Sequence, residues 1–173
     1  YFIVVYESDP DAIRAAVPEP MEPDGSNRVF YEWINMPDSS GFGSYQESGV
    51  VIPCRLNGEE VNFTWMMFLN DEPPITGGRE IWGFPKRWGE PRLSVVKDTL
   101  TGTLDYAGER VALGTMVYKH TAAEKDPARR RAALEKTQVN LKLIPDVDGT
   151  PKIAQLVAYN LTDITVKGMW SGD

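Results

Sequence analysis

The 173-residue chain has little with which to build a metal site, since it contains a single cysteine, Cys54, and a single histidine, His120. One thiol cannot form an internal disulfide, and one thiol with one imidazole cannot supply the cluster that zinc requires. Cys54 lies inside a strand-like run, where a free cysteine acts as a small hydrophobic residue. His120 has no partner at a recognisable spacing and is interpreted as structural or surface-exposed. We therefore expect no metal centre.

Basic residues are also scarce. The chain carries 18 Lys and Arg against 25 Asp and Glu, which gives a formal net charge of -7. A surface that follows nucleic-acid phosphates needs a basic excess to release counterions, so we expect no nucleic-acid partner. No apolar run approaches the roughly 18 residues of a membrane span, and no charged and apolar leader stands at the start. These absences predict a soluble, cytoplasmic protein with no membrane partner.

The chain does have enough apolar sequence for one core. A length of 173 residues with 42% hydrophobic content fits a single domain that covers residues 1–173. The sequence begins inside one strand-like run and stops just after another. We therefore expect this domain to be incomplete at both ends.

Most of the sequence has a strand pattern, with short runs rich in Val, Ile, Tyr, Phe and Thr between Gly, Pro, Asn and Asp. We predict strands at 1–6, 28–36, 48–56, 60–69, 92–97, 100–106, 110–119, 138–144 and 152–166. Asn57-Gly58 supplies the two positive-φ residues of a type I′ hairpin turn, and further turns are expected at Ala107-Gly108 and 145–151. The pattern predicts a mainly β fold, closed or sandwiched, with antiparallel pairing.

Two short helices are expected. The first has Ser8 or Asp9 as its cap, Pro10 in its first turn and Pro18 as its stop. The second, at 126–136, carries three arginines. We interpret these arginines as a solvated face rather than an anion site, because charge runs are normally solvated.

Two acidic residues, Glu32 and Glu47, are candidates for a catalytic role. Glu32, in "RVFYEWINM", shares a strand face with Phe30, Ile34 and Met36, so its carboxylate is buried if that face is inward. Such an acid either pairs with a core arginine or has a catalytic role. Glu47 lies where a Gly- and Ser-rich loop becomes a strand, a position that suits either an exposed acid or a catalytic one.

The stretch "GREIWGFPKRWGEP" contains two adjacent cations, Lys86 and Arg87. An amine is a nucleophile only when neutral, and at the ordinary lysine pKa of about 10.4 only about one in 2,500 is neutral at pH 7. Burial among apolar residues disfavours the ammonium, and a neighbouring like charge disfavours it further. Four apolar residues flank Lys86: Trp82, Phe84, Pro85 and Trp88. Lys86 is therefore a candidate nucleophile, with extension of both cations into solvent as the alternative.

That stretch resembles acetoacetate decarboxylase, and so do the segments "SYQESG", "TLTGTLDY", "MVYKH" and "LKLIPDVDGTPKI". The resemblance runs from Tyr1 to Trp170, with the segments in the same order as in the family. The block from Gly-Arg-Glu to Pro-Lys is the specific part of the resemblance. Acetoacetate decarboxylase is itself an established example of a lysine activated by desolvation or by a neighbouring cation. The resemblance implies a cone-like antiparallel β-barrel with few short helices, assembled into a large homo-oligomer.

By the same resemblance, Lys86 corresponds to the family's Schiff-base lysine. Glu47 and Glu32 correspond to its two active-site glutamates, which favours a catalytic role for Glu32 over a core ion pair. The family's substrate-binding arginine would fall before Tyr1.

Arg87 stands where the best-known members have a second lysine. It keeps a positive charge next to Lys86, but on a longer and planar group. Together with Phe84 and Trp82, it is a candidate for binding the substrate or tuning the lysine.

The resemblance implies decarboxylation of a β-keto acid, with acetoacetate as the expected substrate, through an imine on Lys86. No cofactor is needed, because the imine itself accepts the electrons. Two other functions stay open: an aldolase-dehydratase that acts on pyruvate-like substrates through the same lysine, and a non-catalytic barrel that binds a small molecule. Retention of Glu47 and Glu32 favours the decarboxylase.

Overall fold

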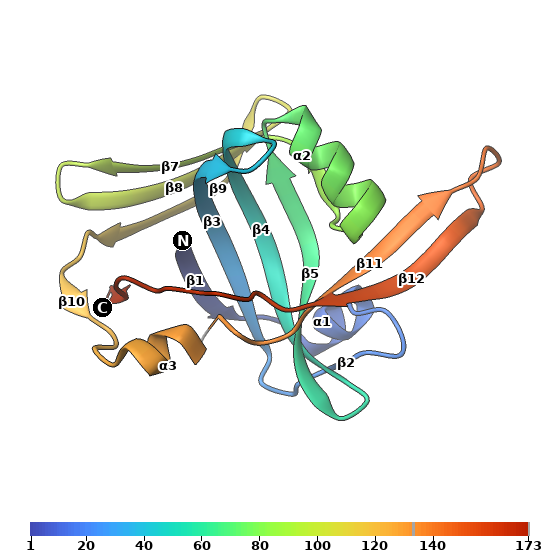
Figure 1. Cartoon of the computed structure of the whole chain (residues 1–173), viewed down its shortest axis with the longest axis horizontal. Coiled ribbons are helices and arrows are strands. Elements are labelled where there is room, and N and C mark those ends of the chain that lie inside the picture. Colours follow the sequence, from blue (N-terminus) through green and yellow to red (C-terminus); the bar gives the residue numbers. More distant parts are fainter. Residues whose placement is uncertain (133, 173) are drawn as a thin grey trace.

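The structure is a computed structural model that describes residues 1–132 and 134–172. Its largest sheet has eight strands in the order β1-β3-β4-β5-β11-β12, with β2 paired to β4 and β6 paired to β5 (Figure 1). The bounds are β1 (Phe2–Glu7), β2 (Glu22–Pro23), β3 (Arg28–Ser39), β4 (Gly43–Leu56), β5 (Glu59–Leu69), β6 (Lys86–Trp88), β11 (Gln138–Pro145) and β12 (Pro151–Tyr159). The predicted mainly β fold is confirmed.

Two smaller sheets and four short helices complete the part of the chain that the structure describes. Three strands form a meander: β7 (Glu90–Val96), β8 (Thr99–Tyr106) and β9 (Glu109–Val117). Two short strands form a pair: β10 (Thr121–Ala122) and β13 (Trp170–Ser171). The helices are α1 (Pro10–Ala16), α2 (Glu72–Gly77), the π-helix η1 (Gly78–Trp82) and α3 (Pro127–Ala132).

The local turn and cap signals have the structural effects expected of them. Asn57 and Gly58 have φ of 53° and 86°, and β4 and β5 pair antiparallel across them. Ala107 and Gly108 likewise have positive φ and join β8 to β9. Asp9 caps α1 by accepting hydrogen bonds from two backbone N–H groups of its first turn.

Three features differ from the sequence prediction. Strand β12 ends at Tyr159 rather than at 166. Helices α2 and η1 were not predicted, because their Pro-Pro and Gly-Gly pairs are typical of loops. Strand β5 pairs parallel with both β6 and β11, whereas the turn signals indicated mainly antiparallel pairing. The predicted helix at 126–136 is described as α3 over Pro127–Ala132, and residue 133 lies outside the described residues.

One face of the large sheet is covered by the β7–β9 meander and by α1. Gly102 of β8 and Gly114 of β9 lie against the ring of Trp33, and a Cβ at Gly114 would come within 2.8 Å of it. Phe2 of β1 stacks on the same ring, with centroids 5.3 Å apart. Helix α1 covers the other end of this face with a core cluster that includes Cys54, as expected for a buried hydrophobic cysteine.

The opposite face of the sheet carries Glu32, because successive strand residues alternate between faces. Met36, Tyr45, Met67 and Leu69 pack there with residues that follow β5 in the chain, including Ile75 of α2. The sheet order runs from β1 to β12 without pairing between these two strands in the described residues, so the closed barrel stays a prediction. None of the described helices is both long and apolar enough to cross a membrane.

Candidate active site

The nucleophile candidate Lys86 and the acid Glu47 are in direct contact. Lys86 Nζ donates a hydrogen bond to Glu47 Oε1 over 2.6 Å, and both side chains are 8% exposed. Strand β5 brings them together: its Met67 pairs with Lys86, and its Leu69 pairs with Glu47. Among the residues that the structure describes, Lys86 is the only buried lysine. The predicted burial of Lys86 is thus confirmed.

Glu32 lies on the same face, diagonal to Glu47. Its register partner on β4 is Gly49, two residues beyond Glu47. Burial raises the pKa of Glu32 to about 7, and the negative charge of Glu47 adds to this. Glu32 therefore exchanges a proton near neutral pH, unlike an ordinary exposed glutamate.

Aromatic rings form the other walls around the Lys86 nitrogen. Nζ lies 5.0 Å from the centroid of Phe84 and 5.8 Å from that of Tyr45. Burial, reinforced by the charge of Glu47, raises the pKa of Tyr45, so its phenol stays neutral. Ring faces attract a cation, so both favour positive charge at this nitrogen.

Sequence reasoning missed Tyr45 and two further tyrosines. Tyr45 precedes Glu47 by two positions on one strand, and this spacing is a signal that places both on one face. Desolvation raises the pKa of the Tyr1 phenol to about 12, although Tyr1 as a whole is 61% exposed, and it also raises the pKa of Tyr159. The charges of Glu32 and Glu47 contribute to both shifts, which indicates that all these groups share one electrostatic environment.

The flanking residues of Lys86 do not all surround it. Phe84 does, whereas Trp82 is 50% exposed and packs on Tyr159, with centroids 6.3 Å apart. Trp88 and Arg87 are exposed. Because alternate strand residues point to opposite sides, Arg87 is directed away from the face that Lys86 occupies.

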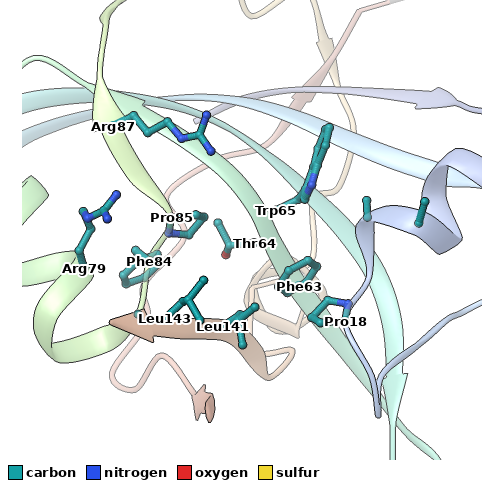
Figure 2. Close-up of a pocket in the computed structure, with 13 residues that line it drawn as sticks. Pro18, Phe63, Thr64, Trp65, Arg79, Phe84, Pro85, Arg87, Leu141 and Leu143 are labelled. Carbon is teal, nitrogen blue, oxygen red and sulfur yellow. The ribbon is translucent and has the colours of Figure 1, made fainter. Parts of the chain in front are cut away.

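Two surface hollows lie beside β6. The first, of about 400 Å³, is walled by Phe63, Thr64 and Trp65 of β5, by Leu141 and Leu143 of β11, and by Phe84, Pro85 and the two arginines 79 and 87 (Figure 2). Neither Lys86 nor either glutamate lines it, so we assign it no catalytic role. The second, of about 670 Å³, is lined by Lys86 and Arg87, together with Arg79 and the turn between β8 and β9.

The family model described as acetoacetate decarboxylase (ADC) matches residues 1–173. The chain belongs to the acetoacetate decarboxylase family. It is 53% identical over 172 residues to an acetoacetate decarboxylase of Paraburkholderia phytofirmans, a match that covers 99% of this chain and 67% of the relative. It also matches the crystal structure of acetoacetate decarboxylase from Legionella pneumophila with a TM-score of 0.94 and 49% identity, over 99% of this chain and 68% of that one. The chain thus spans about two thirds of the length of these relatives.

A more distant likeness extends to the fold alone. The enduracididine biosynthesis enzyme MppR, in complex with the condensation product of pyruvate and imidazole 4-carboxaldehyde, matches with a TM-score of 0.80 at 20% identity. The match covers 98% of this chain and 70% of that one. Similarity at this level does not carry an activity from one protein to the other.

Proposed function

We propose that the chain is a carboxy-lyase that decarboxylates a β-keto acid through an imine on Lys86, with acetoacetate as the expected substrate. The observation that carries the proposal is the buried 2.6 Å contact between Lys86 Nζ and Glu47 Oε1. The contact supports the proposal, because a lysine nucleophile needs a nearby proton acceptor in a site that excludes water. Membership of the acetoacetate decarboxylase family and the names of its relatives support the choice of substrate.

Glu47 takes the proton that Lys86 must lose before its nitrogen can attack. The amine then adds to the ketone carbon of the substrate. The proton on Glu47 passes to the hydroxyl group of this adduct, which leaves as water and gives a protonated imine whose nitrogen carries the positive charge.

The cationic imine is the electron sink for the decarboxylation. The bond between the α carbon and the carboxylate breaks, CO2 leaves, and the electron pair of that bond passes through the α carbon to the imine nitrogen. The product is a neutral enamine. Glu47 regains a proton from solvent and passes it to the α carbon, and water hydrolyses the restored imine to give acetone and free Lys86.

The rings of Phe84 and Tyr45 lie near the nitrogen that carries the charge during these steps. They favour the cationic imine and exclude water from it. Glu32, whose pKa is raised to about 7, can hold a proton close to Glu47 without adding a full negative charge. We assign Glu32 to the proton network rather than to attack on the substrate.

Other properties of the whole protein are proposals that rest on family membership. We propose a single domain over residues 1–173 that forms part of a cone-like β-barrel, and a large homo-oligomer in the cytoplasm. The proposed partner is a small keto acid, and the proposed chemistry uses no cofactor.

Parallel assays of full-length protein test the reaction. The protein is incubated with acetoacetate and, separately, with pyruvate plus an aldehyde, while CO2 and enone absorbance are followed. We expect CO2 from acetoacetate and no enone. Enone without CO2 would instead establish the aldolase-dehydratase, and binding without either product would establish a binding barrel.

Borohydride reduction tests the nucleophile. Treatment with acetoacetate and borohydride should add mass to the peptide that contains Lys86, because reduction fixes the imine as a stable amine. Labelling of Lys97 or Lys119 in its place would refute the assignment. Protein treated with borohydride alone is the control.

A further inference from the structure

Gly78 lies closer to the Lys86 side chain than a residue with a side chain could. A Cβ at position 78 would stand 2.7 Å from Lys86 Cδ, 3.0 Å from Cε and 3.3 Å from Nζ. Carbon atoms in favourable contact are about 3.5–4.0 Å apart. The backbone at Gly78 has φ −61° and ψ −45°, which is ordinary right-handed helix that any residue adopts. Glycine is therefore needed here for space and not for conformation.

The carbonyl of Gly78 also holds the residues that lead into Lys86. Gly78 begins the π-helix η1, and its oxygen accepts hydrogen bonds from the N–H groups of Gly83 and, over 3.0 Å, of Phe84. Such wide turns occur frequently at functional sites. The same residue thus contacts the Lys86 side chain and fixes the backbone of Phe84, whose ring faces the Lys86 nitrogen.

Both backbone groups of Lys86 are held by this segment. The N–H of Lys86 donates to the Phe84 carbonyl over 2.8 Å, and Arg79 Nη1 donates to the Lys86 carbonyl over 3.0 Å. At the far end of the turn, Gly83 lies against Lys142 of β11, with no room for a Cβ. The turn is thus fixed to the sheet, and a group added at Gly78 would displace the lysine side chain.

We propose that Gly78 is a positioning residue for the nucleophile. Because Gly78 has no side chain, the methylene groups of Lys86 can lie directly against the backbone of η1. Nζ can then lie between Glu47 and Phe84. The inference rests on the proposed role of Lys86 as the nucleophile. A methyl group at position 78 pushes Cδ and Cε away and moves Nζ out of line with the substrate carbonyl.

Gly77 provides a matched control one position earlier. Its backbone is also right-handed helix, with φ −61° and ψ −39°. A Cβ there would meet the Phe42 ring at 3.6 Å, an ordinary contact, and nothing of Lys86. Gly77→Ala therefore adds the same methyl group to the same segment without touching the nucleophile.

The catalytic test compares Gly78→Ala with Gly77→Ala in full-length protein. We expect Gly78→Ala to lower kcat and the rate of borohydride trapping at Lys86 by about 10²-fold, since a misplacement of about 1 Å can cost that much. KM should change less, and Gly77→Ala should keep the wild-type values. If the wild type itself is not trapped at Lys86, the proposed function fails. If the wild type is trapped and Gly78→Ala is trapped equally fast, the positioning role of Gly78 is refuted.

A double-mutant cycle tests the contact without relying on activity. The melting temperature is measured for the wild type, Gly78→Ala, Lys86→Ala and the double variant. Gly78→Ala should lower it when Lys86 is present and have much less effect when Lys86 is truncated, because the group that it displaces is gone. If Gly78→Ala fails to fold, Lys86→Ala should restore folding. Equal losses in both backgrounds, or no restoration, would contradict the inference.

Discussion

Lys86 Nζ and Glu47 Oε1 lie 2.6 Å apart although 39 positions separate the two residues in the sequence. They meet because β5 lies between β4 and β6 and pairs with both. Glu47 and Lys86 are thus held by the sheet itself, on strands whose backbones are hydrogen-bonded. A site on rigid elements holds its reacting groups in place better than one built from loops.

Glu47→Gln separates proton transfer from nucleophilic attack. The amide can still contact Lys86 Nζ, but it cannot take up and return a proton as the carboxylate does. We expect kcat with acetoacetate to fall by about 10²–10⁴-fold, the usual range for a lost acid-base group. Borohydride should still label Lys86, because water can take the amine proton in place of Glu47. Glu59→Gln, at an exposed hairpin position, is the control. Wild-type turnover in Glu47→Gln would remove this residue from the mechanism.

Glu32 should make stability depend on pH. Its pKa rises from 4.5 to about 7 on folding, so between these values the folded protein binds more protons than the unfolded chain. The stabilisation from the neutral acid is present below about pH 4.5 and is lost as the pH rises through about 7.

Glu32→Gln mimics the neutral acid and should remove the loss of stability that the wild type shows as the pH rises. The free energy of unfolding of Glu32→Gln minus that of the wild type should increase by up to about 3 kcal/mol as the pH is raised from 5 to 8. One pKa unit corresponds to about 1.4 kcal/mol. Urea denaturation at both pH values measures the difference. Glu109→Gln, an exposed position on β9, should show no such change. Parallel curves for Glu32→Gln and the wild type would contradict the prediction.

Arg87→Gln tests whether the neighbouring cation activates the lysine. Arg87 is exposed and follows Lys86 on a strand, so the two side chains point to opposite faces. We expect the acid limb of the pH–rate profile to move by less than about one unit, because solvent screens the charge. A shift of about two units or more would show that the charge of Arg87 dominates over burial. Circular dichroism of the variant checks that the fold is retained.

Phe84 and Trp82 should differ in their effect on turnover. Phe84→Leu keeps an apolar wall but removes the ring face 5.0 Å from Lys86 Nζ, whereas Trp82 packs on Tyr159 instead. We expect Phe84→Leu to lower kcat by about tenfold, which corresponds to a cation–π contribution of about 1–2 kcal/mol in a desolvated site. Trp82→Leu should lower kcat much less. The reverse order would assign the cation-stabilising ring to Trp82.

Much of the fold could be predicted from sequence because its signals are local. The Asn57-Gly58 hairpin follows from two residues that tolerate positive φ, and the start of α1 follows from the Asp9 cap. Strand parity correctly placed Glu32 on one face with Ile34, opposite Trp33. Lys86 was identified by its apolar sequence neighbours, and it is buried in the structure, although of these neighbours only Phe84 lies against its nitrogen.

Other features depended on contacts between distant segments. No local pattern shows that β6 joins β5 in parallel, and this pairing, together with that of β4 and β5, brings Lys86 to Glu47. Sequence proximity made Trp82 and Arg87 candidates, but the backbone of the π-turn and β6 directs them elsewhere. Tyr45 enters the site through the sheet register, and Gly78 through a steric contact with a side chain eight positions later. The sequence by itself determined the strands, turns and chemically capable groups, because these depend on neighbouring residues. Only the tertiary structure decided which groups meet, because long-range pairing and packing set the distances between them.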